Sequence, residues 1–267
     1  LIKSMVKEER DIPILPPYTT DTLLKDASAL LGMRSSIAMG IAQELFEKGL
    51  ITYHRTDSTR ISPSGINIAE KYLREKIGDP YKNIFSPRTW GEGGAHDSRQ
   101  LRLAIEEGEI DIKLSREHIR VYDLIFRRFI SSQISGMKGN YIIFDFEIDG
   151  KEYREERIIK RYVEGIDDNL SLDFVYPGIR TQDSLDSSIE GLKENRIRLI
   201  PYRNTFRSEI LPYTEGDLVS EMKRNGIGRP STYATIIETI KGRGYATEKG
   251  SWIIPTDLGI EVHRFLS

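Results

Sequence analysis

The chain has 267 residues, of which 38% are hydrophobic and 30% charged, with a formal net charge of -2 and no cysteine. These values are typical of a globular protein with one large domain or a few small ones, and they exclude disulfides, thiolate metal sites and thiol catalysis. Because the charges nearly balance, any binding of nucleic acid must depend on local patches.

The opening residues, LIKSMVKEER, are charged where a signal peptide would be apolar, and no apolar run approaches the roughly 20 residues of a membrane span. We therefore expect a cytoplasmic protein with no membrane partner. High charge without cysteine also favours a thermophilic source. Since the chain opens on Leu1 and stops after HRFLS, we interpret it as an internal fragment of a larger protein. The proline-rich stretch IPILPPYTT then predicts the entry to a domain.

Three helices are predicted next. The first has Thr20 as its expected N-cap and ends at Gly32, and the second starts at Ser35 or Ser36 and ends at Gly49. Apolar residues recur at helical spacing on their buried faces: Leu23, Leu24, Ala27, Leu30 and Leu31, then Ile37, Ala38, Ile41, Ala42, Leu45 and Phe46. SPSG supplies an N-cap and an N1 proline for a third helix. The first two, joined by a tight turn, resemble a helix-turn-helix unit.

The middle of the chain changes from helix to strand. A loop is expected over residues 78–98, followed by a long helix near 117–134. The predicted buried stripe of that helix consists of Ile119, Tyr122, Phe126 and Phe129. From residue 141 to about 210 the pattern favours strands, with a hairpin turn at Asp149-Gly150.

Helices return towards the C-terminus. They are expected near residues 215–224 and 231–241, and GYATEKGSWIIP then predicts a small hairpin before a last helix from about Thr256. The order is thus a helical block, a β-rich block and a second helical block.

The stretch EKGLITYHRTDSTRISPSG carries the strongest chemical signal. It places Arg55 and several short polar side chains directly after Tyr53. A tyrosine hydroxyl has a pKa of about 10, so a nucleophilic tyrosine needs help, and a nearby arginine can favour the phenolate and hold a phosphate with its forked donors. These side chains suit attack on a phosphodiester. On composition alone, the commoner interpretation is a half-buried tyrosine before a polar turn, with Asp57 or Ser58 capping a helix.

GLITYHRTDSTRIS closely resembles the active-site motif of type IA DNA topoisomerases, in which a tyrosine followed by x-Arg-Thr-Asp-Ser is the nucleophile. Further stretches are similar to segments of that family, in its order: LPPYTTDTLLKDAS, GEGGAH, VYDLIFRRFISSQ and GIGRPSTYATIIETIKGRGY. The forms PYTTDTLL, YDLIFRRF and LGIEV look closer to the topoisomerase half of reverse gyrase than to ordinary bacterial topoisomerase I.

The resemblance implies a mixed α and β, multidomain fold that is part of the type IA toroid. It places the end of the β-rich arch segment at residues 1–14 and a helical, winged-helix-like domain carrying the tyrosine at 15–136. The β-rich arch domain would occupy 137–210, and part of a helical domain lining the single-strand groove would occupy 211–267.

Site roles follow from the same resemblance. Tyr53 would be the nucleophile and Arg55 the residue that stabilises the phosphate. The implied DNA-binding residues are Asp57, Ser58, His96, Arg229, Ser231 and Thr232. Pro230 and Ser231 are expected to begin a helix whose N-terminal amides suit a phosphate, and a plain N-cap after a turn is the alternative. The chain departs from the family after GAH, where relatives continue with Glu-Ala-Ile-Arg-Pro-Thr and this chain reads DSRQL.

The implied activity belongs to the full-length protein, which would cleave one DNA strand through a 5′-phosphotyrosine, pass a strand and reseal it. Magnesium would be held by a Toprim domain and ATP by a helicase-like half. The sequence contains neither an acidic Asp-x-Asp-x-Asp type cluster nor a GxxxxGK[ST] loop, so we expect the fragment to bind no cofactor and to be inactive alone. The expected partner is DNA, chiefly single-stranded, and the expected state is monomeric.

The alternative is a winged-helix DNA-binding module without chemistry, in which Tyr53 is merely packed. Such a module should concentrate Lys and Arg on a recognition helix, whereas residues 211–267 carry basic and acidic residues in balance. A tyrosine recombinase or a replication-initiator nuclease would need other clusters of arginine or histidine, and the chain has 4 isolated histidines.

Overall fold

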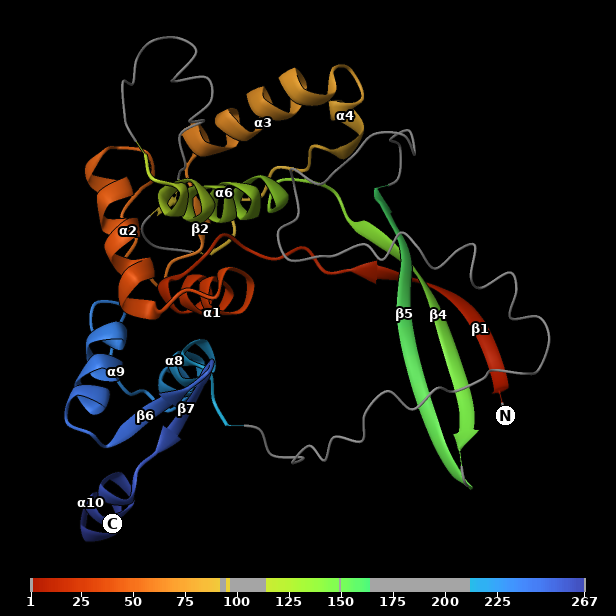
Figure 1. Cartoon of the computed structure of the whole chain (residues 1–267). Helices are drawn as coiled ribbons and strands as arrows, with labels where there is room; N and C mark the ends of the chain where they lie inside the picture. Colours follow the sequence, from red (N-terminus) through yellow and green to blue (C-terminus); the bar gives the residue numbers. More distant parts are fainter. Residues whose placement is uncertain (1, 92–94, 97–113, 149, 164–211, 267) are drawn as a thin grey trace.

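The computed structural model describes residues 2–91, 95–96, 114–148, 150–163 and 212–266. Within these ranges a helical body carries a long sheet on one side and a smaller set of helices and a hairpin below it (Figure 1). The strands expected between residues 164 and 210 lie outside the described residues. None of the described helices is long and apolar enough to cross a membrane.

The helical body is built from four helices that the sequence predicts, namely α1 (Thr20–Leu31), α2 (Ser35–Glu47), α3 (Pro63–Ile77) and α6 (Arg116–Ser131). The short α4 (Tyr81–Ile84) lies where a loop was expected. Gly32 and Gly49 follow the first two helices at positive φ, 63° and 69°, a conformation that glycine adopts without steric cost. Ser62 caps α3 by accepting a hydrogen bond from the Gly65 amide at 3.0 Å. The N-cap of α1 is Thr19 rather than Thr20.

One apolar core joins these helices. Its fully buried side chains include Leu24, Leu45, Leu50, Leu73, Ile84, Val121 and Ile130. Three residues predicted to be buried are exposed, namely Leu30, Ile37 and Ile119. Each lies in a terminal turn, where the apolar stripe of its helix extends beyond the core.

The sheet has strand order β1-β4-β5 and is antiparallel throughout. Its strands are β1 (Ile2–Ile12), β4 (Met137–Ile148) and β5 (Lys151–Val163). The hairpin between β4 and β5 turns at Gly150, with φ of 76°, as predicted. β1 pairs with β4 along nearly its whole length, so the first residues of the chain join a sheet whose other strands come after α6.

The C-terminal part contains α8 (Glu215–Arg224), α9 (Tyr233–Gly242), the hairpin of β6 (Ala246–Lys249) and β7 (Trp252–Pro255), and α10 (Asp257–Leu266). The helix expected from Pro230 begins only at Tyr233, because residues 230–232 form a turn instead. α8 packs closely on α1: a Cβ added to Gly216 would lie 2.6 Å from the Cα of Lys25.

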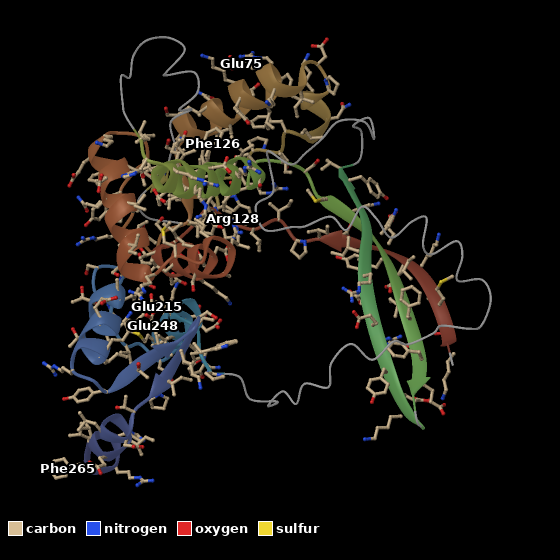
Figure 2. All side chains as sticks on the ribbon, viewed as in Figure 1. Glu75, Phe126, Arg128, Glu215, Glu248 and Phe265 are labelled. Atoms are coloured by element: carbon tan, nitrogen blue, oxygen red, sulfur yellow. The ribbon has the colours of Figure 1, made fainter. Side chains whose placement is uncertain are left out.

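A buried carboxylate joins this part to the helical body. Glu215 is 4% exposed, and its side chain accepts hydrogen bonds from the Ser35 amide at 2.6 Å and from Lys241 at 2.7 Å. Burial acts to raise the pKa of Glu215, but the bonds from Lys241 and Ser35 outweigh it and hold that pKa below its ordinary value. Figure 2 shows Glu215 and Glu248 below α1 and α2, and Glu248 forms an ion pair with Arg34 at 2.8 Å.

Candidate active site

Tyr53 lies in an irregular segment, residues 52–59, that connects α2 to the short strand β2 (Arg60–Ile61). We call residues 52–59 the tyrosine segment. Tyr53 is 51% exposed and Arg55 is also exposed, whereas His54 between them is only 5% exposed. The inward side chain of His54 therefore separates two outward ones, and the pair predicted to be catalytic is open to solvent.

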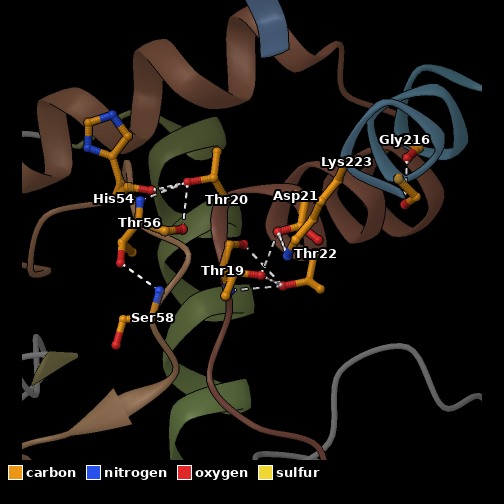
Figure 3. Close-up of polar contacts among 10 residues, drawn as sticks. Thr19, Thr20, Asp21, Thr22, His54, Thr56, Ser58, Gly216 and Lys223 are labelled. Carbon is orange, nitrogen blue, oxygen red and sulfur yellow. Dashed lines mark hydrogen bonds and ion pairs between the residues drawn. The ribbon is translucent and has the colours of Figure 1, made fainter. Parts of the chain in front are cut away.

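Thr20, at the start of α1, holds the backbone on both sides of Arg55 (Figure 3). Its hydroxyl lies 2.8 Å from the His54 carbonyl oxygen and 3.0 Å from the Thr56 carbonyl oxygen, so the two share its proton. The same hydroxyl accepts a hydrogen bond from the Thr56 amide at 2.9 Å, and the Thr20 amide donates to the Thr56 carbonyl at 2.9 Å. A buried helix terminus thus fixes the path of the tyrosine segment.

The hydroxyls that follow Arg55 mainly shape the backbone. The Thr56 hydroxyl accepts a hydrogen bond from the Ser58 amide at 3.0 Å, and the Ser58 hydroxyl accepts one from the Arg60 amide at 3.2 Å. Asp57 is exposed. Neither Asp57 nor Ser58 caps the next helix, which Ser62 does, so that part of the alternative interpretation is wrong.

The two ends of the GEGGAH stretch lie at the end of the tyrosine segment and beside the strand that follows it. β3 (Ala95–His96) runs parallel to β2, with His96 opposite Ile61. At the other end, the Gly91 amide donates to the Thr59 hydroxyl at 3.3 Å. The structure therefore places the backbone of His96 beside the strand that continues the segment, and contact of its side chain with the cleavage site stays a prediction.

The ring of Tyr53 packs against two other rings, those of Phe46 and His54. The centroid of Phe46 lies 5.3 Å from that of Tyr53 and 6.2 Å from that of His54, and the rings of Tyr53 and His54 are 5.6 Å apart in an edge-to-face arrangement. A cavity of about 40 Å³ next to them is bounded on its other sides by residues that include Tyr18 and Phe129.

The His54 ring is unusual because both nitrogens are buried without a hydrogen-bond partner among the residues that the structure describes. Burial, together with the charge of Arg55, lowers the pKa of His54 to about 4, against an opposite effect of Glu47. The ring is therefore neutral at ordinary pH. The sequence predicts no role for His54, since nothing in the local pattern distinguishes an inward histidine from an outward one.

The residues of GRPST lie on the turn between α8 and α9. Arg229, Ser231 and Thr232 are all exposed. The Thr232 hydroxyl accepts a hydrogen bond from the Arg229 amide at 2.8 Å, and the Arg229 carbonyl accepts from the amides of Thr232 and Tyr233. These amides close the turn, so the prediction that Pro230 and Ser231 open a helix is wrong. Within the described ranges, no hydrogen bond or ion pair joins this turn to the tyrosine segment.

A metal site is not formed by the residues described. Across those ranges, no group of three or more His, Asp or Glu side chains is arranged to hold a metal ion. The donor set around Tyr53, an arginine with hydroxyls and a single exposed Asp57, does not suit Mg²⁺, which prefers several oxygen ligands.

Comparison with known proteins gives consistent matches. A family model described as DNA topoisomerase matches residues 1–267. The chain is 46% identical over 296 residues to reverse gyrase 2 of Sulfurisphaera tokodaii, covering 100% of this chain and 24% of that protein. It is 40% identical over 278 residues to reverse gyrase of Pyrococcus furiosus, covering 99% of this chain and 22% of that protein.

Among solved structures, full-length topoisomerase I from Thermotoga maritima matches with a TM-score of 0.64 and 26% identity, covering 100% of this chain and 44% of that one. The chain spans less than a quarter of the length of the two reverse gyrases. The first alignment covers more residues than the 267 of this chain, so that relative carries residues with no counterpart here.

Proposed function

Because the chain belongs to the type IA DNA topoisomerase family, we propose that it is the part of a reverse-gyrase-like isomerase that carries the strand-cleaving tyrosine. The observation that carries the proposal is the exposure of Tyr53 and Arg55 on a segment whose backbone is bound to α1 through Thr20. Such a pair meets a DNA phosphate from solvent without any rearrangement of the core.

The reaction is a transesterification. The Tyr53 hydroxyl oxygen attacks the scissile phosphorus and loses its proton, an O–P bond forms, and the bond from phosphorus to the 3′ oxygen breaks. The departing 3′ oxygen takes up a proton, which leaves a 5′-phosphotyrosine and a free 3′ hydroxyl. The reverse attack reseals the strand without ATP, because the phosphotyrosine keeps the energy of the diester.

Arg55 stabilises the charge that develops on the phosphate, through its planar pair of donors. Asp57 and Ser58 support the segment, and the exposed side chains of the GRPST turn contact the DNA backbone at a distance from the tyrosine. His96 contacts DNA near the scissile bond. These roles rest on the family motifs, together with the exposure of Asp57 and of the GRPST turn and the position of the His96 backbone.

The full-length protein supplies what these residues do not. Mg²⁺ and ATP are bound by parts outside this chain, the substrate is DNA with a single-stranded region, and the chain alone does not cleave it. The chain contributes residues 15–136 as the tyrosine domain and 211–267 as part of the single-strand groove. The arch consists of residues 1–14 and 137–210.

The test is the substitution Tyr53→Phe in the full-length protein. End-labelled single-stranded DNA is incubated with enzyme, the reaction is stopped with detergent, and the protein–DNA adduct is digested and mapped. We expect the wild type to carry a 5′ phosphate on Tyr53, and the variant to form no adduct while binding the strand with unchanged affinity, because only the attacking oxygen is lost.

Tyr153→Phe is the matched control, because Tyr153 is 45% exposed but lies on β5 of the sheet. It should form adduct like the wild type. An adduct that persists in Tyr53→Phe, or that maps to the 3′ side of the break, would contradict the assignment. Binding by the wild type without any adduct would favour the DNA-binding module instead.

A further inference from the structure

His54 is the least expected residue of the site. Among the described residues, neither nitrogen of its buried ring has a hydrogen-bond partner, which is destabilising. Hydrogen bonding therefore does not account for this residue, and what its side chain contributes is the shape of the ring. The position directly after Tyr53 suggests that this shape serves the nucleophile.

Three contacts hold His54 in place. The Thr20 hydroxyl donates to its carbonyl oxygen at 2.8 Å, which fixes the backbone. Its ring lies beside Phe46 of α2 and meets the ring of Tyr53 edge to face, with centroids 6.2 Å and 5.6 Å away. Phe46 also meets Tyr53 edge to face at 5.3 Å, so each ring touches the other two. The side of Tyr53 that faces away from these rings is open to solvent, and about half of the residue's surface is exposed.

We propose that His54 is a positioning residue for the cleavage reaction: its buried ring, packed against Phe46, turns the phenol of Tyr53 outward. The proposal rests on the proposed function, in which Tyr53 is the nucleophile. Rate depends steeply on such placement, because a small displacement of an attacking atom lowers the fraction of productive encounters.

The surroundings keep this ring uncharged. Arg55 opposes a second positive charge next to it, whereas Glu47 at the end of α2 favours protonation. Three more residues line the cavity beside the ring, namely Tyr18 before α1, Leu23 of α1 and Phe129 of α6. None of these side chains is charged at neutral pH. A neutral ring leaves Arg55 free for the phosphate, whereas a protonated one would compete for it and leave its pocket.

The experiment compares His54→Phe with His54→Ala in the full-length protein. The first keeps an aromatic ring and removes the nitrogens, and the second removes the ring. Adduct formation is measured in single turnover with saturating end-labelled single-stranded DNA at neutral pH, and the Kd for the strand is measured separately. We expect His54→Ala to lower the cleavage rate about tenfold or more while the Kd changes less than about twofold, since the ring acts on the tyrosine and not on DNA.

His54→Phe should restore the rate to within about threefold of the wild type. Phe46→Leu keeps His54 but loses the ring contacts with both His54 and Tyr53, and it should slow cleavage with little change in Kd. It replaces His54→Ala in the comparison if that variant does not fold. A wild-type rate in His54→Ala, or in Phe46→Leu where that variant is used, would overturn the proposal. So would a His54→Phe rate as low as that of His54→Ala, because the nitrogens would then be essential.

Failure of the proposed function gives a different result. In that case the wild type itself would form no adduct, or one on another residue, before any variant is compared. An adduct on Tyr53 in the wild type with no effect of the ring variants would leave the function standing and reject only the role of His54.

Discussion

At the scale of single residues, His54 makes the stability of the chain depend on pH. In the folded chain its pKa is about 4, below the ordinary value of 6.5, so between these values the unfolded chain takes up a proton that the folded chain does not. This contribution to stability is complete above pH 6.5 and is lost as the pH falls towards 4. The free energy of unfolding of the 267-residue chain, measured with urea across this range, should fall less steeply in His54→Phe than in the wild type.

Thr239→Val is the control for that measurement, because it changes no ionisable group and lies on an exposed face of α9. Equal slopes for wild type and His54→Phe would mean that the imidazole is not held neutral by burial.

The sequence predicts the site residues through the resemblance of GLITYHRTDSTRIS to the family motif, and their catalytic roles stay predictions. The sequence did not predict the direction of the side chains, of which the structure shows Tyr53 and Arg55 exposed. His54 faces inward, where it contacts the Phe46 ring and accepts a hydrogen bond from the Thr20 hydroxyl. The residues next to His54 in the sequence give no sign of either contact.

At the scale of elements, the N-terminus of α1 determines the shape of the tyrosine segment. Thr20→Val keeps the shape of the side chain but removes the hydroxyl, which leaves the Thr56 amide without its acceptor and the His54 carbonyl without its donor. Thr20 is 1% exposed, so water cannot easily replace them. We expect a loss of about 1–3 kcal/mol in the free energy of unfolding, together with slower cleavage by the full-length protein.

Thr239→Val provides the matched comparison. The hydroxyl of Thr239 donates to a carbonyl of its own helix, that of Thr235, at 2.7 Å on an exposed face. Its removal should change the free energy of unfolding by about 0.5 kcal/mol or less, as is usual for surface substitutions. A similar small effect of Thr20→Val would show that the segment does not depend on this hydroxyl.

Element boundaries were predictable wherever one residue type dictates the backbone. Gly32, Gly49 and the pair Ser62-Pro63 marked helix ends correctly, because positive φ and N-terminal proline are local requirements. The start of α9 was misplaced because Pro230-Ser231 has the same composition as a helix start, while the amides of Thr232 and Tyr233 instead close a turn on Arg229.

At the scale of the whole molecule, the family resemblance implied that residues 1–14 belong with the β-rich arch, but the register in which β1 pairs with β4 was beyond sequence reasoning. The contacts of Glu215 were beyond it too, because Glu215 looked like any acidic residue in the first turn of a helix. Its burial against the Ser35 amide is a property of the assembled α1–α2 and α8–α9 pairs.

Glu215 is therefore expected to stabilise the contact between these two pairs of helices. Glu215→Gln removes the charge that balances Lys241 and weakens the bond to the Ser35 amide, so the free energy of unfolding should fall by about 3 kcal/mol.

Glu238→Gln is the matched control. Glu238 also contacts Lys241, at 3.2 Å, and the Ser36 hydroxyl, at 3.1 Å, but 47% of its side chain is exposed. This substitution should therefore lower the free energy of unfolding by about 0.5 kcal/mol or less. In a double-mutant cycle, Lys241→Met should lower the free energy of unfolding less in the Glu215→Gln background than in the wild type. In that background the buried carboxylate that Lys241→Met would leave without its partner is already neutral. Additive effects in urea unfolding would mean that the two side chains do not act as a pair, and an equal loss from both glutamate variants would mean that burial does not decide their contribution.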